Sequence, residues 1–100
     1  MAVGAPRRET SKTRHHRESA AFRRVVLRLG RRLRRLRRER GWTVEKAAAR
    51  YGVEPAHVRR VESGSTNPSL ATLVSIARAL AVDLADLLGD RRGPRRRPES

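Results

Sequence analysis

The 100-residue chain has no cysteine, one residue each of Phe, Trp and Tyr, and no long apolar run. Without cysteine it cannot form a disulfide framework, a zinc ribbon or a thiol nucleophile. No apolar run approaches the ~18 residues that span a bilayer. The N-terminus also lacks the apolar stretch of a secretory signal. We therefore expect a soluble cytoplasmic protein that is not associated with a membrane.

Charge is distributed very unevenly between the two signs. Lys and Arg total 25 against 10 Asp and Glu, which gives a net charge of +15. This favours a polyanionic partner, because each neutralised phosphate releases a condensed counterion. Arginine accounts for 23 of the basic residues, and it binds phosphate bidentately and stacks on bases. Nucleic acid is thus favoured over a membrane surface, so we expect the protein to associate with the nucleoid. The alternative is that the arginines serve solubility alone.

The apolar content limits the core. The 37 hydrophobic residues include 13 alanines, which leaves 24 larger side chains. These suffice for a bundle of about 60 residues but not for an enzyme with a deep pocket. His15 and His16 are adjacent without further ligands, and Asp83 and Asp86 are typical of a helix N-terminal turn, not of an acid/base pair. We expect no enzyme, no cofactor and no metal.

Two basic segments flank the apolar region. Residues 1–18 contain almost no large apolar side chain, and we predict a flexible basic N-terminal arm. Residues 90–100 carry five arginines with Pro94 and Pro98, and we predict a disordered basic C-terminal tail. Both segments could lie along a phosphate backbone. The folded domain is expected over residues 19–89.

A helical period begins the apolar region. One amphipathic stripe consists of Phe22, Val25, Val26, Leu29, Leu33 and Leu36. Gly30 lies within the stripe and weakens a helix by ~1 kcal/mol relative to alanine, so the helix could start there instead. Gly41 ends it.

Capping signals predict four further helices and no strand. Thr43 is expected to cap a helix over 44–51 that Gly52 closes, and Pro55 to begin a helix that ends at about Glu62. Ser69 is expected to cap a helix that reaches Leu80. Asp83 is expected to cap a last helix over 84–88 that Gly89 closes. The fold class is therefore all-α with five helices, the first of them long.

The spacing within residues 44–62 is typical of a helix-turn-helix unit. Ala48 is small enough for two helices to approach, and Gly52 can adopt positive φ at the turn. Val58 and Val61, three residues apart, would anchor the second helix and leave its opposite face exposed. The alternative is an ordinary corner between two helices in any small bundle.

Residues 29–89 resemble the lambda-repressor-like, or Cro/xenobiotic-response-element, family of helix-turn-helix proteins. The matching residues are Leu29-Gly30, Leu33, Leu36-Arg37, Arg40-Gly41, Ala48, Gly52-Val53, Val61-Glu62, Gly64, Asn67-Pro68-Ser69-Leu70, Leu73, Ile76-Ala77, Ala79-Leu80, Val82 and Leu87-Leu88. The resemblance implies a five-helix DNA-binding domain that acts in transcription regulation in bacteria and phages.

The resemblance also implies roles for individual residues. Helix 55–62 would enter the major groove, and the residues implied to face base edges are Glu54, Pro55, Ala56, Arg59 and Arg60. Those implied to contact the sugar-phosphate backbone are Thr43, His57, Ser63, Asn67 and Ser69, which set register without reading sequence. Arg37 and Glu62 match a partly buried structural ion pair of the family. Arg60 is the best candidate for a bidentate contact to guanine.

Three residues depart from the family pattern. Val44 stands where a phosphate-binding glutamine is common, so either the contact is lost or the arginines replace it. Glu54 would repel phosphate unless it accepts from a cytosine amino group. Ala47 replaces a frequent leucine and thins the core.

The sequence therefore predicts a sequence-specific regulator of double-stranded DNA, in particular a repressor, that acts as a homodimer. The alternatives are an antitoxin that binds a toxin partner and represses its own operon, and a non-specific charge-driven binder of DNA or RNA. The stripe from Phe22 to Leu29 exceeds what the shared domain needs. We expect it to lengthen the first helix and to contribute to a dimer or partner surface, the alternative being that it packs on the fifth helix.

Overall fold

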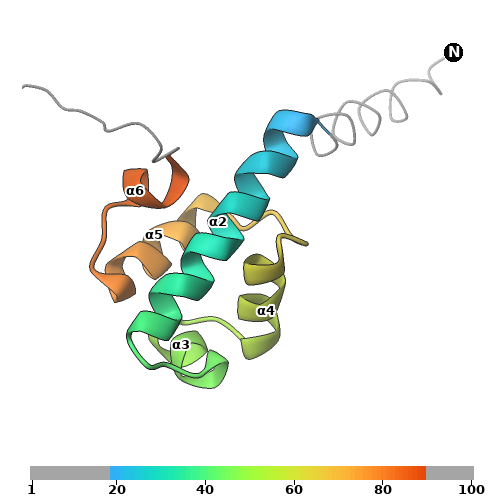
Figure 1. Cartoon of the computed structure of the whole chain (residues 1–100). Helices are drawn as coiled ribbons and strands as arrows, with labels where there is room; N and C mark the ends of the chain where they lie inside the picture. The colour runs from blue at the N-terminus through green and yellow to red at the C-terminus, as the bar shows by residue number, and fades with distance from the viewer. Residues whose placement is uncertain (1–18, 90–100) are drawn as a thin grey trace, which may run out of the picture.

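The computed structural model describes residues 19–89, which fold into helices without a strand. The helices are α2 (Ala20–Glu39), α3 (Val44–Tyr51), α4 (Pro55–Ser63), α5 (Leu70–Leu80) and α6 (Leu84–Leu88). The long α2 crosses the molecule, with α4 on one side, α5 and α6 on the other, and α3 near its C-terminal end (Figure 1). This confirms the all-α, five-helix prediction. The predicted arm over 1–18 and tail over 90–100 lie outside the described residues.

Helix α2 begins at the predicted edge of the domain and runs without a break through Gly30. Ser19 caps it, because the Ser19 Oγ accepts a hydrogen bond of 3.1 Å from the backbone N–H of Phe22. The alternative start at Gly30 is therefore wrong. A Cβ atom at position 30 would lie 2.4 Å from the carbonyl oxygen of Glu62. The glycine thus lets α2 and α4 meet backbone to backbone.

The shorter helices follow their local signals closely. The Thr43 and Ser69 hydroxyls each accept a 3.0 Å hydrogen bond from the backbone N–H three residues on. Gly52 closes α3 with φ of 78°, while α4 ends at Ser63, one residue later than expected. Asp83 precedes α6 as predicted, but its side chain makes no capping hydrogen bond. We therefore correct its assignment as a side-chain cap.

The hydrophobic core lies where all five helices converge. Its buried members are Leu29, Leu33, Ala47, Ala48, Tyr51, Val58, Val61, Leu73, Ile76, Ala77, Leu80 and Leu87. Val26 and Leu29 of the N-terminal stripe are both buried within the chain, whereas Phe22 and Val25 remain partly exposed. The stripe does lengthen α2, but half of it is already covered by the chain itself.

Arginines on α2 also hold the C-terminal part of the fold. Arg32 Nη1 donates hydrogen bonds to the backbone oxygens of Asp86, Leu87 and Gly89 at 2.6, 3.1 and 2.8 Å. Arg40, just after α2, donates to a carbonyl at the end of α5. Cations are favoured there because the last carbonyls of a helix lack intrahelical partners and carry partial negative charge.

Candidate nucleic-acid interface

Helices α3 and α4 and the short turn between them form a helix-turn-helix unit. Gly52 takes a left-handed conformation, and the N–H groups of Gly52 and Val53 both donate to the carbonyl oxygen of Ala48, at 2.9 and 3.0 Å. No atom lies within 4 Å of a Cβ built on Gly52. The glycine is therefore required by its positive φ and not by lack of space.

Helix α4 has one buried and one exposed face. Val58, Val61 and Glu62 are buried against the rest of the domain, while Ala56, Arg59 and Arg60 are exposed. Proline occupies the first helical position, after an exposed Glu54 whose side chain makes no capping hydrogen bond. The exposed face therefore combines a small side chain with two long cationic ones.

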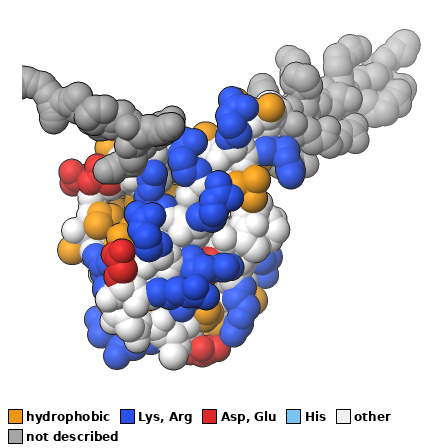
Figure 2. Space-filling view, in the orientation of Figure 1, with side chains coloured by type: hydrophobic (Ala, Val, Ile, Leu, Met, Phe, Trp, Pro, Cys, Tyr) orange, Lys and Arg blue, Asp and Glu red, His pale blue; other side chains and the backbone are white. Residues whose placement is uncertain are grey.

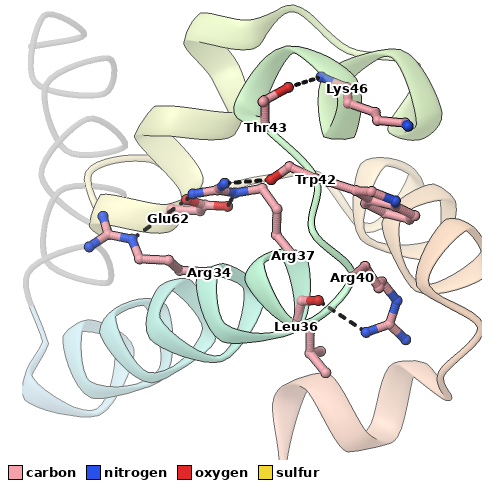
Figure 3. Close-up of polar contacts among 8 residues, drawn as sticks. All are labelled: Arg34, Leu36, Arg37, Arg40, Trp42, Thr43, Lys46 and Glu62. Carbon is pink, nitrogen blue, oxygen red and sulfur yellow. Dashed lines mark hydrogen bonds and ion pairs between the residues drawn. The ribbon is translucent and has the colours of Figure 1, made fainter.

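A buried ion pair connects α4 to α2. Arg37 Nε and Nη2 donate to the two Glu62 carboxylate oxygens at 2.7 and 3.0 Å, and Arg37 Nη1 donates to the carbonyl oxygen of Trp42 at 2.9 Å (Figure 3). The hydrogen bonds to Glu62 are the main cause that raises the pKa of Arg37 above its usual value. Arg34 approaches the same carboxylate at 3.6 Å from the other side. The Arg37–Glu62 pair thus fixes the C-terminal end of α4 on α2.

An open groove of about 490 Å³ runs between α2 and the helix-turn-helix unit. Its lining residues are Arg34, Arg37, Arg38, Val44, Arg59, Arg60, Glu62 and Ser63. Five of these are arginines, and the carboxylate of Glu62 is already bound by Arg37. The groove therefore attracts anions, and its arginines lie beside Val44, the position where a phosphate-binding glutamine was expected.

Arg59 is held by a carboxylate from the neighbouring helix. Its Nη2 donates to Glu45 Oε2 at 2.9 Å, and both side chains are exposed. The pKa of the Glu45 carboxyl is lowered below its usual range, first by a hydrogen bond from the backbone N–H of Glu45 and second by the hydrogen bond from Arg59. Arg59 therefore already has an anionic partner within the described part of the chain.

The residues expected to contact the DNA backbone are dispersed. Ser63 lines the groove, and its hydroxyl donates to the carbonyl oxygen of Arg60 at 3.1 Å. Thr43 and Ser69 are exposed helix caps, and Asn67 is exposed in the loop after α4. His57 is half-buried and is not among the residues that line the groove.

Two features of the interface were missed in the sequence. The sequence assigned no individual role to Arg34 and Arg38, yet both line the groove beside α4. The pairing of Glu45 with Arg59 joins residues 14 positions apart on different helices, so no rule of helical spacing indicates it. Only the groove arginines could have been found from the sequence, because arginine is unusually frequent in the segment that forms α2.

Over residues 19–89 no group of three or more His, Asp or Glu side chains is arranged to hold a metal ion. None of the helices in that range combines the length and apolar character needed to cross a bilayer.

Residues 28–88 match a protein family described as "Helix-turn-helix domain". Over 54 residues the chain is 41% identical to y4dJ of Sinorhizobium fredii, described as an uncharacterised HTH-type transcriptional regulator, with coverage of 54% of this chain and 70% of that protein. It is 39% identical over 62 residues to the HTH-type transcriptional regulator DdrOP3 of Deinococcus deserti, with 62% of this chain and 48% of that protein covered.

Two solved structures share the fold. The restriction-modification controller protein C.AhdI of Aeromonas hydrophila aligns with a TM-score of 0.60 and 34% identity, over 62% of this chain and 94% of that one. The clp gene regulator ClgR of C. glutamicum aligns with a TM-score of 0.61 and 31% identity, over 64% and 82%. These similarities confirm the resemblance to regulators of the lambda-repressor-like type.

Proposed function

Because the chain belongs to the helix-turn-helix family of DNA-binding transcriptional regulators, we propose that it reads a specific sequence in double-stranded DNA and represses transcription there. Helix α4 would lie in the major groove, with its N-terminal residues near base edges. Arg60 would donate two hydrogen bonds to a guanine, and Ala56 would contact a thymine methyl group. The register of the protein on DNA would be set by contacts to the sugar-phosphate backbone from Thr43, Ser63, Asn67 and Ser69.

The observation that carries this proposal is the division of α4 into two faces. Its buried face is fixed to α2 by the Arg37–Glu62 pair and by the backbone contact at Gly30. Its opposite face presents Arg59 and Arg60, both exposed. A helix held this rigidly can present its side chains to base edges at little further cost in conformational entropy, which favours specific readout over loose attraction.

The active unit is proposed to be a homodimer on two half-sites about one helical turn of DNA apart. Among the described residues three large apolar side chains are exposed: Leu27 on α2 at 37%, and Leu70 and Val74 on α5 at 64% and 39%. The two on α5 lie one turn apart on the same face, so they favour α5 over the Phe22–Leu29 stripe as the surface for a second copy. Val25 in that stripe is only partly buried. Its substitution therefore tests whether the stripe contributes to a dimer surface without creating a cavity in the core.

A selection from random duplexes at about 150–200 mM salt tests the function, because this salt concentration weakens binding through phosphates alone. Enrichment of an inverted repeat supports the dimeric, sequence-specific regulator. If no motif is enriched and all duplexes bind with a steep salt dependence, the proposal is wrong. Sedimentation of Leu70→Ser and Val25→Ser variants then locates the dimer surface.

The density of arginine favours one second candidate, a non-specific charge-driven binder of nucleic acid. The two functions differ in how they respond to loss of the arginines on α4. Arg60→Ala should lower affinity for the selected sequence far more than affinity for an unrelated duplex, if α4 reads bases. Equal losses on both duplexes would favour the non-specific binder.

A further inference from the structure

Helix α2 carries nine arginines and one acidic residue, and these arginines point in different directions. Arg28 and Arg32 point to the C-terminal end of α6, where they donate to backbone carbonyls. Arg37 points inward to Glu62. The remaining arginines of the C-terminal half lie on the outer face, and this division separates those that hold the fold from those available to a partner.

The outer face forms a second open groove of about 520 Å³, lined by Arg31, Arg34, Arg35, Arg38 and Glu39. Its only carboxylate, Glu39, lies 3.7 Å from Arg35. Arg34 and Arg38 also line the groove beside α4, so the two grooves are continuous. Figure 2 shows the resulting band of basic side chains along α2.

The charge of this band is poorly balanced by the chain itself. Seven arginines and two glutamates line the two grooves together, and Glu62 is bound by Arg37 and lies 3.6 Å from Arg34. The stretch from Arg31 to Arg38 covers roughly 10 Å of helix axis. Over the same length one strand of B-form DNA carries about three phosphates. The spacing and sign of charge therefore match a phosphate backbone better than an isolated anion.

The geometry points to a phosphate-binding track on α2, formed by Arg31, Arg34, Arg35 and Arg38, which extends the DNA footprint beyond the recognition helix α4. This inference rests on the proposed function, because it takes duplex DNA as the partner. The track begins in the groove beside Val44 and follows the outer face of α2 away from α4. It contributes affinity and salt dependence, whereas sequence is read by α4.

Salt dependence of binding tests the track directly. The double variant Arg31→Gln/Arg38→Gln is titrated with fluorescently labelled duplexes, one selected and one of random sequence, from about 50 to 200 mM salt. Each lost phosphate contact should lower the slope of log K against log salt by about 0.9. We therefore expect a slope lower by about 1.8 on both duplexes, with the preference between them unchanged.

Three controls make the result decisive. Arg78→Gln on α5 removes one exposed arginine that lines neither groove and should leave the slope unaltered. Arg31→Lys/Arg38→Lys keeps the charge and should keep most of the slope. Circular dichroism and the fluorescence of Trp42, the one tryptophan, verify that each variant is folded.

The outcomes separate the track from the proposed function. An unchanged slope for the double glutamine variant overturns the track even if a specific sequence has been selected. A lower slope without any selected sequence supports the track and contradicts the sequence-specific regulator. If the variant retains its slope on duplexes and loses binding only to single-stranded RNA, the track for duplex DNA is likewise overturned.

Discussion

The backbone of Gly30 on α2 lies directly against the backbone of Glu62 on α4. A Cβ at position 30 would lie 2.4 Å from the Glu62 carbonyl oxygen and 2.7 Å from that of Val61. These are backbone atoms within a helix, so they cannot move aside as a flexible side chain would. The residue that weakens α2 locally is thus the residue that lets the recognition helix dock.

Gly30→Ala should therefore destabilise the protein, although alanine is the better helix former. We expect a loss of about 1–3 kcal/mol, the usual cost of overpacking a close contact. At exposed Arg24 on the same helix, replacement by alanine should be more stable than replacement by glycine by about 1 kcal/mol. Urea denaturation followed by Trp42 fluorescence measures both effects. Stabilisation by alanine at position 30 would show that the helices do not meet there.

The helix ends could be predicted from the sequence, whereas the role of Gly30 could not. The bounds of α3 and α5 follow from local signals, since Thr43, Gly52 and Ser69 act within one helical turn of their own positions. The role of Gly30 depends on a segment more than 30 residues away, and only the fold reveals it. The position of the helix-turn-helix unit and the Arg37–Glu62 pair could thus be predicted, whereas the backbone contact between α2 and α4 could not.

The same limit applies to the arginines. Composition predicted an anionic partner but could not assign roles to individual side chains along α2. Arg32 and Arg31 are neighbours in sequence, yet one binds backbone carbonyls of α6 and the other lines an open groove. Their different roles follow from a rotation of about 100° around the helix axis for each residue, combined with the position of α6.

Removal of the buried carboxylate should be among the most damaging single changes. Glu62→Gln leaves the guanidinium of Arg37 buried without its counter-charge, which typically costs about 3–5 kcal/mol. The double variant Arg37→Met/Glu62→Met should regain much of that loss, because it removes both charges together. Chemical denaturation of the three proteins gives the free energies of unfolding. A cost below about 1 kcal/mol for Glu62→Gln would mean that water already solvates the pair.

Stability at alkaline pH should be governed by Tyr51. Burial is the main cause that raises the pKa of its hydroxyl from 10.0 to about 12. The unfolded chain therefore releases this proton first, so the free energy of unfolding falls as pH rises from about 10 to 12 and is unaffected by this group below that range. Urea denaturation at several alkaline pH values measures the fall, and Tyr51→Phe should remove it.

At neutral pH Tyr51→Phe should not destabilise the protein. Among the described residues the Tyr51 hydroxyl is a buried polar atom without a hydrogen-bond partner. Its loss removes a desolvated group whose burial typically costs about 1–3 kcal/mol. The edge-on contact with Trp42, with ring centroids 6.4 Å apart, is retained by phenylalanine. A marked loss of stability in the variant would reveal a partner for the hydroxyl, such as a bound water.

The attachment of α6 should depend on a guanidinium at position 32. Lysine keeps the charge, but its ammonium nitrogen ends one bond short of the position of Nη1, the single atom that makes all three contacts. Arg32→Lys should therefore lower stability by about 1–2 kcal/mol and accelerate amide hydrogen exchange in α6. Arg31→Lys, at the neighbouring exposed position, is the matched control and should change neither quantity. Equal exchange rates in the two variants would show that hydrophobic packing alone holds α6.

Glu45 should limit how strongly the protein binds DNA of any sequence. Its carboxylate holds Arg59 at 2.9 Å and repels phosphate from the same face, so Glu45→Gln both releases an arginine and removes a negative charge. We expect higher affinity for random duplexes, a steeper salt dependence and a smaller preference for the selected sequence. Asp83→Asn, which removes one exposed charge before α6, controls for net charge. If Glu45→Gln instead weakens binding to the selected sequence alone, Glu45 orients Arg59 toward a base and does not restrain it.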